Sequence, residues 1–373
     1  MNVLHLTSHL NLGGIPSYVV SLSTALMRRG HRITVVSGGG ELEPSLVATG
    51  VAHWESPLAT SVEFSPRVWL ATLALAERLR RDPVDLLHAH TRVAQVAAAR
   101  LSRWRRLPYV TTWHGFYRPN VGRRLWPCTG DRTIAISEPV QQHLIDTFKV
   151  PAERIRLIPN GVDADRFAQL PDAGQVEAFR RRWNLHDAGR VIGGIGRLAS
   201  GGVKGFDLLL SALPLIHREL PDVRVIIIGD GPGRETLERQ TDQLGLRNAV
   251  RFVGGVQDTR VPLALMDVFV FPVRWPEGFG LALVEAMAAG KPVVAARTGA
   301  IPDIVRHARD GWLIEPESPA SLAEGVVRLL NDRAFADALS GQARTRARET
   351  FGLSRMVEQV EEVYRECVPD RNA

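Results

Sequence analysis

The feature that most constrains the fold is the segment of residues 268–296, in which a strand, a glycine-rich turn, a helix and a second strand follow one another. Residues 268–271 form a short apolar run bounded by proline, which is typical of a buried strand. From Leu281 the apolar residues recur at helical spacing until Gly290 and the proline after it end the helix. Residues 292–296 form a second apolar run. A helix between two buried strands predicts an α/β fold with a parallel sheet.

The turn before this helix predicts a phosphate site. A turn through Phe279, Gly280 and Leu281 presents unpaired backbone N–H groups and the positive end of the helix dipole, and both favour an anion. Glu277 lies in the turn and Glu285 lies beyond the first helical turn, so each can accept hydrogen bonds from sugar hydroxyls beside the phosphates. A nucleoside diphosphate sugar carries a sugar on both sides of its phosphates and fits this arrangement.

These residues carry a resemblance to a known family. The two glutamates at E-x7-E spacing, the Gly-Phe-Gly-Leu core and the closing Gly-Lys-Pro-Val-Val strand resemble the donor-site signature of the retaining glycosyltransferases of family 4. The resemblance covers nearly the whole chain, with five segments in the family's order. It implies the GT-B fold, in which two Rossmann-like doubly wound α/β domains face each other across a cleft. It also implies transfer with retained anomeric configuration, no cofactor and no metal.

The length of 373 residues favours two domains. We expect an acceptor-binding domain over residues 1–167 and a nucleotide-sugar-binding domain over 168–352, with a C-terminal helix in 353–373 that packs back on the first domain. The boundary lies near an Asn-Gly-Val-Asp segment that resembles the family's passage between domains. Asp163 and Asp165 there imitate a metal-binding pair, and we interpret them as a structural turn.

Composition excludes several classes of protein. The chain is 45% hydrophobic and 23% charged, which is ordinary for a globular protein. No run of about 18 apolar residues predicts a membrane span, and no basic leader with a cleavage site precedes the first strand. The two cysteines predict neither a metal site nor a disulfide framework. We expect a cytoplasmic protein, with peripheral attachment to the inner face of the cytoplasmic membrane as a further possibility.

The first half contributes a glycine turn and three histidines at strand ends. Gly13 and Gly14 open a helix at the carboxyl end of the first predicted strand, where ligands bind in such sheets. A plain helix-entry turn is the alternative, and the family places donor phosphates and sugar over this loop. His88, His90 and His114 end strands, and no carboxylate or cysteine shares their spacing to complete a metal site. The Trp-His-Gly segment resembles the family position whose histidine contacts the donor sugar, which selects His114 as a catalytic residue.

The second half supplies fixed positive charge. Arg197 and Lys204 flank a glycine-rich loop and match the family's Gly-Arg-Leu and Lys-Gly segments, so we expect them to stabilise a diphosphate leaving group. A salt-bridged surface loop is the alternative. In the family the turn at Val256 cradles the nucleobase through backbone groups. Ser137 is predicted to cap a helix, and the family places a phosphate or sugar contact near it.

Excess positive charge lies in the first half, where residues 1–165 contain 19 Lys and Arg against 13 Asp and Glu. Arginine alternates with tryptophan in two clusters, which suits an anionic membrane surface. A solvated basic face is the alternative, and nucleic acid is disfavoured because no recognition motif accompanies the charge. The clusters are residues 100–106 and a second group made of Arg118, Arg123, Arg124, Trp126 and Arg132.

The sequence thus predicts a hexosyltransferase that uses a UDP- or GDP-sugar. A glycan or lipid-linked acceptor is expected, in the biosynthesis of bacterial polysaccharide, lipopolysaccharide or glycolipid. A sugar-nucleotide epimerase of the same architecture, an NAD-dependent dehydrogenase and an idle sugar-binding relative are the alternatives. The chain departs from the family at Arg274 and Trp275, where many relatives carry a serine before the donor motif. The identity of the donor sugar is therefore left open.

Overall fold

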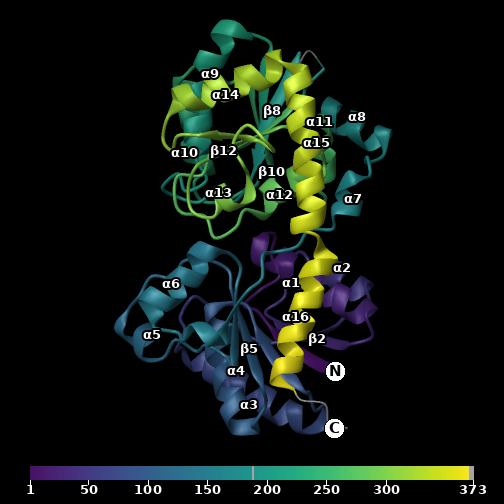
Figure 1. Ribbon diagram of the computed structural model, residues 1–373, viewed down its shortest axis with the longest axis vertical. Coiled ribbons are helices and arrows are strands. Elements are labelled where there is room, and N and C mark those ends of the chain that lie inside the picture. The colour runs from purple at the N-terminus through teal and green to yellow at the C-terminus, as the bar shows by residue number, and fades with distance from the viewer. Residues whose placement is uncertain (187–188, 369–373) are drawn as a thin grey trace. The chain divides into compact units, whose positions relative to one another are not determined.

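The computed structural model describes residues 1–186 and 189–368, and Figure 1 traces the chain through two compact units. The first unit comprises Met1–Gly161 together with the chain from Leu353 onward, and the second comprises Val162–Gly352. The predicted boundary after residue 167 lies a few residues beyond this division. The last residues of the predicted helix 353–373, from 369 onward, lie outside the described residues.

The first unit is built on a seven-stranded sheet in the order β3-β2-β1-β4-β5-β6-β7, and all its strand pairs are parallel. The strand order turns back at β1 and β4, which is the mark of a doubly wound sheet. The strands are β1 (Asn2–Leu6), β2 (Arg32–Ser37), β3 (Ala52–Glu55), β4 (Leu86–Ala89), β5 (Tyr109–Trp113), β6 (Arg132–Ala135) and β7 (Ile155–Leu157).

Helices connect these strands because parallel neighbours need a crossover. Their buried faces carry the apolar residues that the sequence spaces at helical period. Ser65 and Asn120 cap two of them with side-chain oxygens. The helices are α1 (Gly14–Arg28), α2 (Glu43–Ala48), α3 (Pro66–Arg81), α4 (Arg92–Arg105), α5 (Val121–Leu125), α6 (Glu138–Phe148), the 3-10 helix η1 (Ala152–Arg154) and α16 (Leu353–Cys367).

The C-terminal helix α16 belongs to the first unit and packs against α1 and β5. Its Glu361 is nearly buried and accepts two hydrogen bonds from the Arg29 guanidinium, at 2.8 and 2.9 Å, and one from His31 at 2.9 Å. A carboxylate enclosed in this way needs such partners. The contact therefore anchors the end of the chain on the first unit.

The second unit contains a six-stranded parallel sheet in the order β10-β9-β8-β11-β12-β13. Its order turns back between β8 and β11, and Figure 1 shows helices on both sides of it. The strands are β8 (Arg190–Ile195), β9 (Val223–Ile228), β10 (Val250–Gly254), β11 (Val268–Phe271), β12 (Val293–Ala296) and β13 (Trp312–Ile314). The helices are α7 (Ala164–Ala168), α8 (Ala173–Arg182), α9 (Phe206–Glu219), α10 (Arg234–Gln243), α11 (Arg260–Leu265), α12 (Leu281–Ala288), α13 (Ile301–Ile304), α14 (Pro319–Asn331) and α15 (Arg333–Thr350).

The predicted fold class, α/β with two Rossmann-like doubly wound domains, is confirmed by these two sheets. The segment of residues 268–296 forms β11, α12 and β12, and β11 and β12 pair in parallel as expected. Asp163 caps α7 through a hydrogen bond from the backbone N–H of Arg166 to its carboxylate, at 3.0 Å. This capping agrees with its interpretation as part of a structural turn.

Candidate active site

The turn at the start of α12 has a conformation that only glycine adopts readily. Gly280 has φ 105°, and a Cβ there would approach Ile301 and Phe271 to 3.2 and 3.3 Å. Phe279 points into the core and packs edge-on against Phe351, so its side chain is structural and its backbone remains for a ligand. Leu281 begins the helix, and its first turn holds no acidic residue. An anion is therefore favoured at this turn.

Lys204 and Glu277, predicted from separate segments, are in direct contact. The Lys204 ammonium donates to the Glu277 carboxylate at 2.5 Å, and both side chains are about one-quarter exposed. The backbone of Glu277 is fixed by a hydrogen bond from the Ala300 N–H to its carbonyl, at 3.0 Å. Gly299 is left-handed, and a Cβ there would lie 2.4 Å from the Glu277 nitrogen. The loop after β12 therefore holds the backbone of Glu277 in place.

The loop that carries Lys204 also depends on a glycine. Gly205 has φ 70°, and a Cβ there would lie 1.7 Å from the Pro272 carbonyl oxygen. This close approach holds Lys204 near the end of β11, with its ammonium 5.7 Å from the centre of the Phe271 ring. Arg197 lies just after β8, exposed, and no ion-pair partner is present for it among the described residues. Its charge is available to a ligand.

Arg274, where the chain departs from the family pattern, has partners inside the second unit. Its guanidinium pairs with Asp207 at 2.6 Å and lies 3.8 Å from Glu317, and its N–H donates to the Val203 carbonyl at 3.1 Å. Arg274 thus braces the loop that carries Lys204. Trp275 next to it is more than half exposed.

Glu285 lies in a largely enclosed environment on α12. Burial raises the pKa of its carboxyl to about 7, although a hydrogen bond from the Thr259 hydroxyl at 3.2 Å and the positive charge of Arg166 act in the opposite direction. Asp258, which is paired with Arg260 at 2.6 Å and lies 3.8 Å from Arg166, also disfavours the ionised form. A carboxyl with this pKa changes charge readily near neutral pH and can accept from hydroxyl groups once ionised.

The surroundings of Glu285 were missed by the sequence analysis. Asp258 and Thr259 follow Val256 closely in the loop from β10 to α11, and Arg260 begins α11. Val256 itself is half-buried. The Asp-Thr-Arg tripeptide was a usable signal, because three polar residues directly follow a predicted base site. The contact between Thr259 and Glu285 of α12 joins residues that are far apart in the sequence, so no local pattern predicts it.

In the first unit, Gly13 and Gly14 are exposed at the start of α1. The preceding N–H, of Leu12, already donates to the Glu41 carboxylate at 2.9 Å. Ser137 is buried and accepts from the Val140 N–H at 3.4 Å, so it caps α6 as predicted. The glycine turn has the features of a helix-entry turn. Because both glycines are exposed, their backbone is accessible to a ligand.

His114 directly follows β5 and is half-buried. Its Nε2 lies 3.4 Å from His90 Nδ1, and the ring of Tyr18 packs against it at 4.7 Å. Burial lowers the pKa of His114 to about 3, so the imidazole is neutral at physiological pH.

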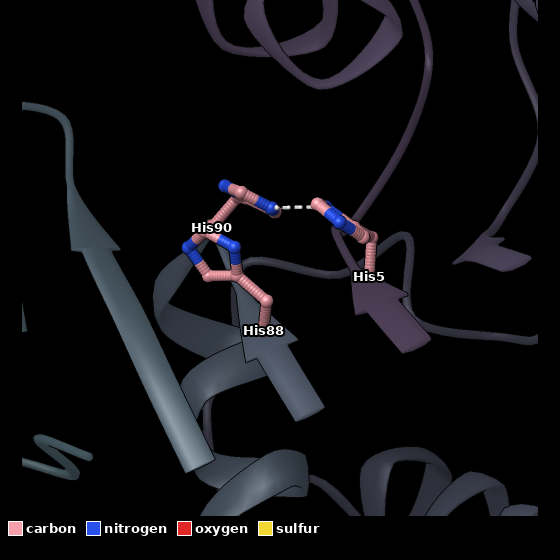
Figure 2. Close-up of side chains that lie close together, drawn as sticks. All are labelled: His5, His88 and His90. Atoms are coloured by element: carbon pink, nitrogen blue, oxygen red, sulfur yellow. Dashed lines mark hydrogen bonds between the residues drawn. The ribbon is translucent and has the colours of Figure 1, made fainter. Parts of the chain in front are cut away.

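A buried histidine cluster lies behind His114 (Figure 2). The ring nitrogens of His5, His88 and His90 come within 4.8 Å of one another, close enough on distance alone for a metal ion. Hydrogen bonds within the unit already engage these nitrogens, with Tyr364 and Thr112 as partners of His88. The sequence analysis missed His5 because it lies in an apolar strand, although parallel pairing with β4 places it directly beside His88.

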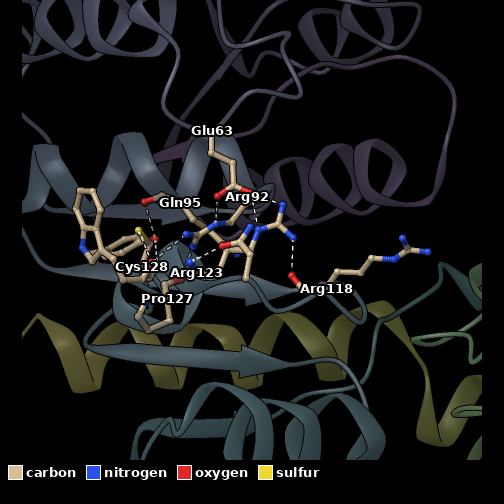
Figure 3. Close-up of polar contacts among 10 residues, drawn as sticks. Glu63, Arg92, Gln95, Arg118, Arg123, Pro127 and Cys128 are labelled. Atoms are coloured by element: carbon tan, nitrogen blue, oxygen red, sulfur yellow. Dashed lines mark hydrogen bonds and ion pairs between the residues drawn. The ribbon is translucent and has the colours of Figure 1, made fainter.

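Arg123 of the predicted basic clusters is not a free surface charge. Arg123 and Arg92 both pair with Glu63, and Arg92 also donates to the backbone carbonyls of Trp126 and Pro127 (Figure 3). Glu63 and Arg92 are less than one-tenth exposed. Arg123 therefore serves an internal ion-pair network, and the predicted solvated or membrane-facing role does not describe it.

Arg100 and Arg132 are also engaged internally. The Arg100 guanidinium stacks over the ring of Trp69 at 4.2 Å and lies 5.4 Å from the ring of Trp126, and the residue is buried. Arg132 pairs with Glu366 at 2.5 Å. Arg100 is therefore part of the packing of the first unit, whereas Arg132 makes a partly exposed ion pair with α16.

Large apolar side chains are exposed on two helices of the first unit. They are Trp69, Leu70 and Leu73 on α3 and Val121 and Leu125 on α5, with exposed fractions from 44% for Trp69 to 81% for Leu125. No helix in the described part of the chain is long and apolar enough to cross a membrane.

Known glycosyltransferases resemble this chain in sequence and in fold. A family model for glycosyl transferases of group 1 matches residues 175–346, and a model for Glycosyltransferase Family 4 matches residues 12–166. The chain is 28% identical to an uncharacterized glycosyltransferase of Methanocaldococcus jannaschii, over 95% of this chain and 94% of that protein. It is 36% identical to a GDP-mannose-dependent alpha-(1-6)-phosphatidylinositol monomannoside mannosyltransferase of Mycobacterium tuberculosis, over 52% of this chain and 51% of that one. The crystal structure of Anabaena HepE in complex with UDP shares the fold, with a TM-score of 0.80 and 25% identity over 98% of this chain and 100% of that one.

Proposed function

Because the chain belongs to the family 4 glycosyltransferases, which have the GT-B fold, we propose that it transfers a hexosyl group from a UDP- or GDP-sugar with retained configuration. The acceptor is a glycan or a lipid-linked molecule, and the reaction needs no metal ion or cofactor. The family membership makes the enzyme a transferase, so the dehydrogenase and epimerase alternatives are not retained.

The observation that carries this proposal is the contact between Lys204 and Glu277 beside the glycine turn of α12. It brings a fixed positive charge from one loop of the second unit together with a carboxylate and a helix N-terminus from the segment of residues 268–296. A diphosphate needs the positive charge and the backbone N–H groups, whereas a sugar needs an acceptor for its hydroxyls. When a donor binds, its phosphates take over part of the Lys204 interaction.

Each site residue has an assigned role in the proposed reaction. Arg197 and Lys204 stabilise the departing diphosphate together with the backbone of the α12 turn. Glu277 and His114 orient the transferred sugar, and Glu285 binds the ribose. The remaining binding positions are the phosphate loop at Gly13 and Gly14, the Ser137 helix start, the base-contacting turn at Val256, and the anion-binding backbone of Phe279, Gly280 and Leu281.

Two relatives bear on the donor nucleotide. The Mycobacterium tuberculosis relative is by name GDP-mannose-dependent, and HepE was solved with UDP. Both nucleotides therefore belong in the first experiment, together with ADP as a control for the base. The same relative acts, by its name, on a phosphatidylinositol mannoside, which supports a lipid-linked acceptor and a pathway of surface glycolipid, lipopolysaccharide or polysaccharide.

The exposed apolar side chains of α3 and α5 support attachment of the protein to the cytoplasmic face of a membrane. Arg118 and Arg124 are exposed and lie next to Val121 and Leu125 in the chain, so anionic headgroups would meet positive charge beside apolar side chains. Replacement of Leu70 by glutamate should abolish sedimentation with vesicles of anionic phospholipid. Glutamate at the exposed Leu170 of the second unit is the matched control, and equal binding by both variants would contradict this attachment.

Thermal denaturation with UDP, GDP, ADP and their hexose derivatives tests the proposed donor site. A ligand that binds only the folded protein raises its melting temperature. Loss of a charge-assisted contact in Lys204→Ala should weaken binding by roughly 10- to 100-fold and remove the shift. Arg218→Ala removes an exposed charge elsewhere in the second unit and should retain the shift. Failure of every nucleotide to stabilise the wild-type protein at millimolar concentration would remove the basis of the proposal.

A further inference from the structure

A chain of hydrogen bonds begins deep in the first unit at His88. Its Nε2 lies 2.8 Å from the Thr112 hydroxyl, and its Nδ1 lies 2.7 Å from the hydroxyl of Tyr364 on α16. The same Tyr364 oxygen lies 3.3 Å from Nε2 of His5. One tyrosine hydroxyl thus joins the histidines of β1 and β4 to the C-terminal helix.

The chain continues from His5 toward the candidate active site. His5 Nδ1 lies 2.9 Å from His90 Nε2, as Figure 2 shows, and His90 Nδ1 lies 3.4 Å from His114 Nε2. His5 and His90 are completely buried, whereas His114 is partly exposed. His114 is therefore the end of the chain that a substrate can reach.

Every imidazole in this hydrogen-bond chain is neutral at physiological pH. Burial lowers the pKa values of His5 and His114 to about 3 and those of His88 and His90 well below their ordinary value. A neutral imidazole has one N–H donor and one acceptor nitrogen. Each histidine must therefore donate on one side of the chain and accept on the other.

This requirement couples the tautomers of all four histidines. If one imidazole reverses its donor and acceptor nitrogens, two donors or two acceptors face each other at both of its contacts, and a buried unsatisfied group is unfavourable. The chain consequently has two satisfied orders, one in each direction. The order fixes whether the outer nitrogen of His114, Nδ1, donates or accepts.

Neither Glu361 nor Tyr18, which lie next to this hydrogen-bond chain, brings an unpaired charge to its histidines. Glu361, one turn before Tyr364 on α16, is engaged by Arg29 and His31. The ring of Tyr18 packs against His90 and His114 and carries no charge, because burial raises the pKa of its hydroxyl.

We propose that His5, His88, His90 and Tyr364 are positioning residues that fix which of the two ring nitrogens of His114 carries the proton. The proposal rests on the proposed function, in which His114 faces the donor sugar. A fixed tautomer gives a sugar hydroxyl one defined hydrogen-bond partner, because the bond made by one ring nitrogen determines the state of the other. Because Tyr364 belongs to the hydrogen-bond chain, the tautomer of His114 depends on the packing of α16 against the first unit.

The test compares Tyr364→Phe with the wild-type enzyme labelled with nitrogen-15 in its histidines. Nitrogen chemical shifts in the NMR spectrum distinguish the two tautomers and the charged form. Tyr109→Phe is the matched control, since it removes another buried hydroxyl of the first unit, one that donates to the Cys128 carbonyl at 2.8 Å. We expect a single neutral tautomer for His114 in the wild type and the control, and a mixture of tautomers in Tyr364→Phe.

Kinetics then separate positioning from structure. Loss of the order should lower kcat for sugar transfer by up to about tenfold, on the scale of one hydrogen bond, with a smaller change in KM for the donor, whereas Tyr109→Phe retains both. An unchanged His114 spectrum in Tyr364→Phe, charged imidazoles or a bound metal in the wild type, or altered tautomers with unchanged kcat would each overturn the proposal. Since the spectra require no donor or acceptor, a failure of the proposed function would be recognised separately.

Discussion

The substitution Glu285→Gln should stabilise the unliganded protein while it weakens nucleotide binding. Glutamine has the shape of glutamate and stays neutral at every pH. In the folded protein the carboxyl has a pKa of about 7 against an ordinary value of 4.5. Ionisation in this enclosed position therefore opposes folding, and the amide removes that penalty.

The pH dependence follows from proton binding in the two states. Between pH 4.5 and 7 the folded protein holds a proton on Glu285 that the unfolded chain has released, so stability falls as pH rises through this window. At about 1.4 kcal/mol for each unit of pKa shift, the full difference is about 3 kcal/mol above pH 7. Solvent reaches part of the Glu285 side chain and reduces this difference, so we expect about 1–3 kcal/mol.

The assay is thermal and urea denaturation of both proteins at several pH values from 4 to 8. The stability gained by Glu285→Gln should be near zero at pH 4.5 and constant above pH 7. The exposed Glu324 of α14, changed to glutamine, provides a control without this dependence. A gain that stays constant from pH 4 to 8 would refute the reasoning, because it would show that burial does not hold the proton on Glu285.

The nucleotide supplies a second, opposite readout. Ribose hydroxyls donate to an ionised carboxylate better than to a neutral amide. The melting-temperature shift produced by the nucleotide should therefore be smaller in Glu285→Gln than in the wild type at pH 8, although the unliganded variant is more stable. A variant that keeps the full shift would show that Glu285 does not contact the ribose.

Two further predictions concern stability. Gly205→Ala should destabilise the second unit by more than about 3 kcal/mol in urea denaturation, because its Cβ would lie 1.7 Å from the Pro272 carbonyl in a left-handed backbone; a loss below 1 kcal/mol would contradict this packing. Glu361→Ala should destabilise the first unit by about 1–2 kcal/mol at pH 7. Burial raises the pKa of Glu361, but Arg29 and His31 outweigh it and lower the folded-state pKa, so the loss should begin to shrink below the ordinary carboxyl pKa of 4.5 and vanish only as pH falls through the lowered value. A loss that does not shrink as pH falls below 4.5 would contradict the ion pair as its cause.

Local patterns in the sequence determined the elements and much of the second-unit site. The apolar run, the glycine turn and the helical spacing fixed β11, α12 and β12, because these choices depend on neighbours within a few residues. Gly280 and Gly205 could be recognised as turn positions for the same reason. Lys204 and Glu277 were selected separately from two motifs, and their direct contact required the folded sheet.

Contacts between distant segments decided what the sequence could not show. His5 lies in an apolar strand and was not selected from the sequence, yet parallel pairing places it beside His88, and Tyr364 reaches both from the other end of the chain. Arg100 read as a surface charge, yet its guanidinium stacks on Trp69 and is buried. Residue type and spacing along the chain determine which elements form and which chemistry is present. The packing of elements far apart in sequence determines which polar groups are buried, which are paired, and which remain for a ligand.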